Sequence, residues 1–250
     1  YSFSIFAIED NPFSIPVVKE FSENKKYAHS MVTTIIEDSS GFIWFGTAGG
    51  VSRYDGYQFT FYDAGKDNKS ITHPNVNRII QDNNGYIWIA TYKGLNRFNP
   101  KTETFKHYFY DKDDLTSINS NFIRSFYLDR NGSLWIGTSR GLNRYNSEKD
   151  NFKRITLSKT NTPLSINHIS EDLSGLIWVS VSDVGLFNFN PQDSTVNQIK
   201  IEVPQYQSDV NKIHSMSIDT NNRLWAATNA GLVEFNINSG EFNIHLLNNK

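Results

Sequence analysis

The acidic residues of this chain repeat at a fixed distance from tryptophan. An aspartate lies six residues before each of the five tryptophans. The pairs are Asp38 with Trp44, Asp82 with Trp88, Asp129 with Trp135, Asp172 with Trp178, and Asp219 with Trp225. A glycosidase needs two carboxyl groups about 5–10 Å apart. A repeating fold instead distributes these five over equivalent turns, so we interpret the aspartates and tryptophans as structural and assign no catalytic residue.

Histidine offers a second kind of chemistry. His29 and His73 each lie fifteen residues before a tryptophan, which predicts matching places on neighbouring repeats. A zinc site needs at least three protein ligands, and the sequence offers no evident third. We therefore predict no metal and no cofactor, and interpret both as loop histidines; a metal pair is the alternative.

The spacing of glycine around each tryptophan predicts β-hairpins. Four repeats read Asp-x-x-Gly before the tryptophan, and the fifth has Asn222 in place of glycine. Asparagine is the residue other than glycine that best tolerates a positive φ, so the motif predicts a turn capped by the aspartate side chain. β-branched strands precede the turn, as in residues 32–36, and a strand that begins at glycine follows it, as in residues 94–98.

Four short strands in about 45 residues are typical of a propeller blade. The sequence therefore predicts an all-β propeller of four-stranded antiparallel blades, with one tryptophan wedged between each pair of blades. Replacement of any of the five by alanine is expected to cost about 3–5 kcal/mol. We predict a single domain over residues 18–250, after a lead-in at 1–17 that resembles a signal-peptide remnant. Its repeats span about 28–66, 67–114, 115–160, 161–205 and 206–250.

Composition excludes several classes of partner and site. The formal net charge is −2 and no run of Lys and Arg exceeds two residues, which argues against nucleic-acid binding. There is no cysteine, hence no disulfide and no thiolate metal site. No stretch approaches the roughly 20 apolar residues that span a bilayer.

Candidate ligand-binding residues lie where the repeats differ. The face of the propeller opposite the aspartate turns carries the variable loops, and such loops on a rigid frame usually hold ligands. Amides hydrogen-bond to hydroxyl groups, aromatic rings stack on sugars, and arginine binds carboxylate or sulfate. The candidates are Tyr92, Lys93 and Arg140 in tight loops, His73, Asn75, Asn121 and His168 in long connections, and Arg78 and Arg124 on the innermost strands.

The run at residues 35–47, IIEDSSGFIWFGT, followed by GVSRYDG at 50–56, resembles the two-component regulator propeller repeat. The resemblance extends over residues 18–250. In that family the propellers lie in the periplasmic sensor region of hybrid two-component kinases of Bacteroidetes and sense carbohydrates. It implies a non-catalytic sensor that binds an oligosaccharide, with the membrane anchor and the kinase outside this chain. It also implies further blades of a larger, seven-bladed type of propeller or a second propeller, and a homodimer of the full-length protein.

Two other functions stay open. Related repeats occur in streptogramin lyases, which use histidines and a glutamate in a metal-assisted elimination, although no compact Glu-x-x-His pattern is present here. A propeller that only binds protein partners is the third possibility. The family's shared motif is the scaffold, so it assigns no ligand residue.

Overall fold

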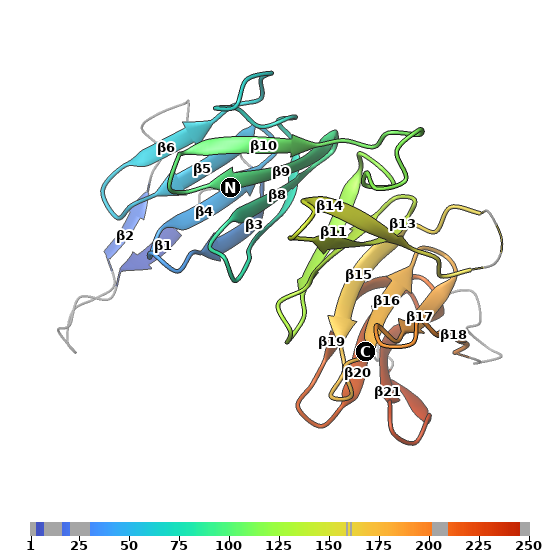
Figure 1. Cartoon of the computed structure of the whole chain (residues 1–250). Coiled ribbons are helices and arrows are strands. Elements are labelled where there is room, and N and C mark those ends of the chain that lie inside the picture. Colours follow the sequence, from blue (N-terminus) through green and yellow to red (C-terminus); the bar gives the residue numbers. More distant parts are fainter. Residues whose placement is uncertain are drawn as a thin grey trace.

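The computed structural model describes residues 4–7, 17–20, 31–158, 160, 162–201 and 210–245. Every named element in this part of the chain is a β-strand, and the strands form five four-stranded sheets and one two-stranded sheet (Figure 1). The small sheet pairs β1 (Ser4–Ala7) with β2 (Val17–Glu20). The other residues of the lead-in predicted at 1–17, and His29, lie outside the described residues.

The five large sheets follow one another in chain order. The first sheet holds β3 (Val32–Glu37), β4 (Ile43–Thr47), β5 (Gly50–Tyr54) and β6 (Phe59–Tyr62), and the second holds β7 (Val76–Gln81), β8 (Ile87–Thr91), β9 (Gly94–Asn99) and β10 (Thr104–Tyr108). The third sheet holds β11 (Ile123–Leu128), β12 (Leu134–Thr138), β13 (Gly141–Asn146) and β14 (Asn151–Ile155), and the fourth holds β15 (Ile166–Glu171), β16 (Ile177–Val181), β17 (Gly185–Phe189) and β18 (Val196–Ile199). The fifth sheet holds β19 (Ile213–Ile218), β20 (Arg223–Thr228), β21 (Gly231–Asn236) and β22 (Phe242–His245).

The sheets are propeller blades, as the sequence predicted. Each is antiparallel, and its strands are ordered first to fourth. The first strands contact one another from sheet to sheet: β3 with β7, β7 with β11, β11 with β15, and β15 with β19. They are therefore the innermost strands. Figure 1 shows the first and the fifth sheet at opposite ends of the series.

The aspartate turn has one geometry in all five sheets. In the first, Asp38 Oδ1 accepts hydrogen bonds from the backbone N–H of Ser40 and Phe42. Its Oδ2 accepts the indole N–H of Trp44 at 2.7 Å. The equivalent indole bonds measure 2.7 Å from Trp88, 2.8 Å from Trp135, 2.8 Å from Trp178 and 3.0 Å from Trp225. One carboxylate thus caps the turn and orients the tryptophan that follows it.

The fourth residue of the turn motif is glycine in four sheets and asparagine in the fifth. It has a positive φ in all five, as the exchange of glycine for asparagine indicated. Gly132 has a φ of 77° and Asn222 a φ of 61°. Asn222 also uses its side chain, because Oδ1 accepts the backbone N–H of Leu173 at 3.0 Å from the neighbouring sheet. Asparagine therefore supplies both the turn and a contact between sheets.

We expect Asn222→Ala to lower the free energy of unfolding by about 2 kcal/mol. About 1 kcal/mol comes from holding alanine at positive φ, and about 1 kcal/mol from the unmet N–H of Leu173. Asn222→Gly keeps the permitted backbone and should lose only the second part. Urea unfolding of the two variants measures the difference; an alanine variant as stable as the glycine variant would contradict the role of φ.

The core lies between the sheets and is built on the tryptophans. Each indole of the first four sheets packs against an aromatic ring on the third strand of the next sheet. The ring centroids lie 5.2 Å apart for Trp44 and Phe98, 4.6 Å for Trp88 and Tyr145, 5.7 Å for Trp135 and Phe189, and 5.7 Å for Trp178 and Phe235. These four indoles are at most 2% exposed.

Trp225 departs from this pattern. It is partly exposed and stacks on His245 of its own sheet, at 5.8 Å between ring centroids. In the described part of the chain no further sheet covers Trp225. Trp225 therefore lacks the contact with a neighbouring sheet on which the expected equal cost at all five tryptophans depends, and we expect a smaller cost there.

Candidate functional site

An open cavity of about 370 Å³ lies along the innermost strands. Its lining comes from β7, β11, β15 and β19 and from the loop after β8. The residues are Asn77, Arg78, Tyr92, Phe122, Arg124, Asn167, His168, Ile213 and His214. Four of the nine predicted ligand-binding residues are among them: Arg78, Tyr92, Arg124 and His168. The cavity is our candidate site.

Aromatic rings form one wall of this cavity. Tyr92 follows β8 and meets Phe122 edge to face, with 4.8 Å between ring centroids. On the other side Tyr92 lies nearly parallel to His73, at 6.1 Å. Asn75 fixes both, because its N–H donates to His73 Nδ1 and its carbonyl accepts the N–H of Tyr92. His73 and Asn75 thus support the wall from behind.

Polar side chains form the opposite wall. His168 Nε2 lies 2.6 Å from the carbonyl oxygen of His214, which can only accept, so Nε2 carries the proton. His214 in turn contacts Asn229 at 2.5 Å. Burial holds the pKa of His168 below its ordinary value and outweighs the bond to the His214 carbonyl, which raises the pKa. The charges of Arg78 and Arg124 lower the pKa further, so the site favours the neutral imidazole.

The other three predicted residues lie elsewhere. Arg140 lies over Tyr110 at 5.5 Å and lines a separate pocket of about 240 Å³ beside β14. Asn121 serves the scaffold, since its side chain accepts the N–H of Tyr110 and its carbonyl accepts that of Gly94. Lys93 is exposed and does not line the cavity. The sequence placed these residues on the variable face but could not say which loops turn towards the axis.

Five lining residues were not among the predicted ligand-binding residues: Asn77, Phe122, Asn167, Ile213 and His214. A signal for three of them was present: the residues eleven before each tryptophan are Thr33, Asn77, Arg124, Asn167 and His214. All five are polar and occupy the second position of an innermost strand. Aligning the repeats at this position would have found this side of the cavity.

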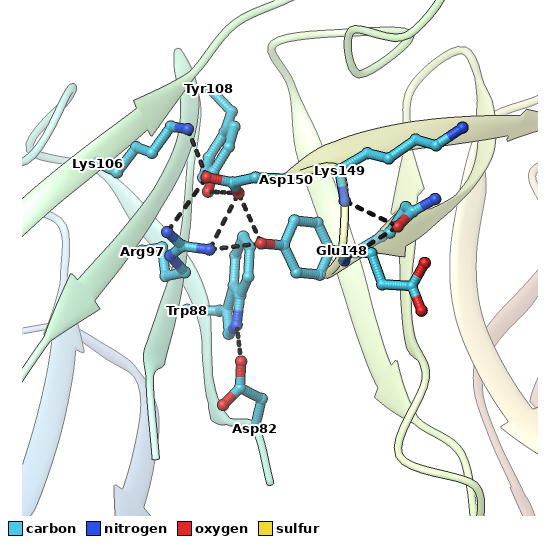
Figure 2. A network of polar contacts seen from close by, with 10 residues as sticks. Asp82, Trp88, Arg97, Lys106, Tyr108, Glu148, Lys149 and Asp150 are labelled. Atoms are coloured by element: carbon cyan, nitrogen blue, oxygen red, sulfur yellow. Dashed lines mark hydrogen bonds and ion pairs between the residues drawn. The ribbon is translucent and has the colours of Figure 1, made fainter. Parts of the chain in front are cut away.

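A second group of charged residues joins the second and third sheets on the face of the aspartate turns (Figure 2). Asp150 accepts hydrogen bonds from Arg97 at 3.0 Å, Lys106 at 2.5 Å, Tyr108 at 2.6 Å and Tyr145 at 2.6 Å. Arg97 also donates to the Tyr145 hydroxyl. Four donors from two sheets thus converge on one carboxylate.

These contacts shift the pKa values of the group. Burial alone raises the pKa of Asp150, but the bonds from Lys106, Tyr108 and Tyr145 and the charge of Arg97 outweigh it and hold the pKa well below its ordinary value. Burial, with the bond to Asp150, raises the pKa of Tyr145 to about 12. A pocket of about 490 Å³ adjoins the group. Its charges are already paired with one another, so we assign the group a structural role.

The comparison with protein families matches the repeats. The two component regulator propeller model matches residues 26–49, 70–93 and 117–140. Each matched segment contains one aspartate turn and its tryptophan. Among curated proteins, no sequence matches significantly. In the described residues no helix is long and apolar enough to cross a membrane, and no cluster of three metal-binding side chains occurs.

Solved structures show the same fold. The chain is similar to the extracellular domain of the hybrid two component system BT3049 from B. thetaiotaomicron, with 25% identity and a TM-score of 0.73 over 86% of this chain and 30% of that one. The extracellular domain of BT4673, a one component system of the same species, shares 22% identity with a TM-score of 0.72, over 88% of this chain and 31% of that one.

Virginiamycin B lyase from Staphylococcus aureus shares 14% identity with a TM-score of 0.65, over 87% of this chain and 70% of the lyase. This likeness, like that to BT4673, shows the fold alone. The chain spans about 30% of the length of the two B. thetaiotaomicron proteins. The two component regulator propeller model thus matches three of the five repeats of this chain, and the two unmatched repeats share the same turn geometry.

Proposed function

We propose that this chain is a ligand-binding part of the extracytoplasmic region of a hybrid two-component sensor, and that its ligand is an oligosaccharide. The family match of three repeats supports a sensor. The similarity to the extracellular domain of BT3049 supports a periplasmic location. In this proposal the chain performs no catalysis, and a histidine kinase beyond it carries the signal onward.

The observation that carries the proposal is the composition of the cavity. Tyr92 and Phe122 offer aromatic faces and edges to the apolar side of a sugar ring. Asn77 and Asn167 bring amide groups to the same cavity, and amides match the donor and acceptor pattern of hydroxyl groups. A volume of about 370 Å³ is in the range of small-ligand sites, which suits one or two sugar rings.

Signalling requires that the ligand bind one arrangement of the sensor better than another. The innermost strands that line the cavity are also those that contact each other between sheets. A ligand that touches β7, β11 and β15 together therefore favours one spacing of these sheets. We propose that further blades or a second propeller, and a second copy of the full-length sensor, read this spacing.

Isothermal titration against a panel of oligosaccharides tests the proposal. We expect saturable binding of at least one glycan without turnover, equal with and without magnesium. Tyr92→Leu should weaken that binding about fivefold or more, because stacking of a ring on an aromatic side chain is worth about 1 kcal/mol. Tyr57→Leu is the matched control, since Tyr57 is 95% exposed and does not line the cavity.

Three outcomes would contradict the proposal. Magnesium-dependent product formation would support a lyase instead. No detectable binding of any oligosaccharide in the panel would favour a surface that binds protein partners. Equal affinity of the Tyr92→Leu and Tyr57→Leu variants would move the ligand to another part of the chain.

A further inference from the structure

The charge of the cavity contrasts with that of the chain. The formal net charge of the chain is −2. The cavity lining nevertheless contains Arg78, Arg124, His168 and His214 and, among the described residues, no Asp or Glu. These four side chains come from four successive innermost strands, β7, β11, β15 and β19. A concave surface lined by one sign of charge attracts ligands of the opposite sign.

The second residue of each innermost strand lies at a shift in register with the neighbouring strand. In three of the five sheets its side chain donates a hydrogen bond to a carbonyl of the next innermost strand and so ties two sheets together. The bonds run from Thr33 to Val76 at 2.7 Å, from Asn77 to Ile123 at 2.7 Å, and from Asn167 to Ile213 at 3.3 Å.

Arg124 occupies this position in the third sheet but does not make the bond. Its neighbour Ser125 makes it instead, with Oγ 3.4 Å from the carbonyl oxygen of Ile166. The guanidinium of Arg124 lies 5.8 Å from the centre of the Phe122 ring, at the cavity wall. The contact between the sheets therefore does not explain why an arginine occupies this position.

Arg124 also carries an unmet hydrogen bond. Its Nε is buried without a partner, and no other buried side-chain nitrogen or oxygen atom of the described residues shares this condition. An unmet buried donor is costly, more so on a charged group. A carboxylate or sulfate can accept from Nε and a terminal nitrogen together, in the two-bond geometry that guanidinium groups favour.

His168 supports an anion in the same place. Burial and the charges of Arg78 and Arg124 oppose a positive charge on the ring. The same field stabilises a negative charge, and a bound anion would relieve the opposition and let Nδ1 take up a proton. The groups that face it are Arg78 from β7, Arg124 from β11 and His214 from β19, and none of them is acidic.

We propose that Arg124, with Arg78 and His168, forms a subsite for a negatively charged group of the ligand, a carboxylate or a sulfate. The inference rests on the proposed function, because it takes the ligand to be an oligosaccharide, and it makes that oligosaccharide acidic. Tyr92 and Phe122 then contact the sugar ring while the arginines hold its charged substituent.

Titration of matched glycans tests the subsite. The probes are trigalacturonate for the carboxylate, a sulfated chondroitin disaccharide for the sulfate, and maltotriose and cellotriose as neutral glycans. We expect an acidic probe to bind, and Arg124→Gln to weaken it about 10- to 100-fold, the usual effect of losing a hydrogen bond to a charged group. Arg130→Gln removes the same charge from the aspartate turn that follows β11, at the end of that strand remote from Arg124 and about 20 Å away at the rise of a strand, and should change affinity less than twofold.

Failure of the subsite and failure of the sensor proposal give different results. A neutral glycan that binds wild type and Arg124→Gln alike, or an acidic glycan insensitive to Arg124→Gln, would overturn the subsite and leave a carbohydrate sensor. If no glycan binds, inorganic sulfate is titrated while the Arg124 Nε–H and His168 ring signals are followed by NMR. Saturable shifts of the Arg124 Nε–H in wild type, together with shifts of the His168 ring signals that Arg124→Gln abolishes, support the subsite; no shift beyond that of chloride at equal ionic strength overturns it.

Discussion

Replacement of Trp135 by alanine is expected to lower the free energy of unfolding by about 3–5 kcal/mol. The indole is 0% exposed and packs between the third and fourth sheets against Phe189. Its removal leaves a cavity that two rigid sheets cannot close. It also removes the donor that Asp129 accepts at 2.8 Å, so the capping carboxylate loses one partner. Urea unfolding, followed by circular dichroism, measures the loss.

Trp225→Ala is the matched control for this variant. It removes the same atoms and the same hydrogen bond to the turn aspartate, 3.0 Å long in this sheet. Because Trp225 is partly exposed and uncovered by a further described sheet, water can fill the space that the indole leaves. We expect a loss of about 2 kcal/mol, the transfer contribution without the cavity contribution. Equal losses for the two variants would show that the indole acts within its own sheet and not as a wedge.

Asp150→Asn is expected to lower the free energy of unfolding by about 2–3 kcal/mol. The side chain keeps its shape and tolerates the φ of 51° at this position. It loses the charge that four donors share, and Arg97, whose side chain is only 16% exposed, is left without its partner. Glu103→Gln is the control, since Glu103 has the same φ and one ion pair, to Arg53, but is 57% exposed. It should cost less than about 1 kcal/mol.

The pH dependence of the unfolding free energy distinguishes the contribution of the Asp150 charge from the contribution of its packing. Its pKa is lower in the folded chain than in the unfolded chain, where it is about 3.9. The stabilisation is therefore complete above about pH 5 and is lost as the pH falls through the folded value. We expect the gap in unfolding free energy between wild type and Asp150→Asn to narrow from pH 6 to pH 3. A gap that stays constant would assign the effect to packing.

The sequence predicted the scaffold well because each blade is specified locally. The aspartate, the glycine or Asn222, and the tryptophan lie within seven residues and bond to one another. Their spacing therefore reports the turn, the strand that follows and the buried face. The ring on which each tryptophan packs could not be predicted in the same way. Phe98, which packs on Trp44, belongs to another repeat, so no local spacing joins the two residues.

The candidate site could be predicted only in part. The repeat placed Arg78 and Arg124 on innermost strands, and both line the cavity. The register shift at the second strand residue changes which side chains turn towards the axis, and the spacing of the repeats does not reveal it. Asp150 and Arg97 are 53 residues apart in different repeats, so no local pattern joins them.

The aspartate turn has a consequence for how such chains grow. All partners of its carboxylate, two backbone amides and an indole, lie within the same sheet. A gene segment that encodes one unit therefore encodes a complete turn cap, and duplication or deletion of a unit leaves the caps of its neighbours intact. Some contacts between units differ from one pair of sheets to the next, as with Glu103, Asp150 and Asn222, and such differences favour one order of the units.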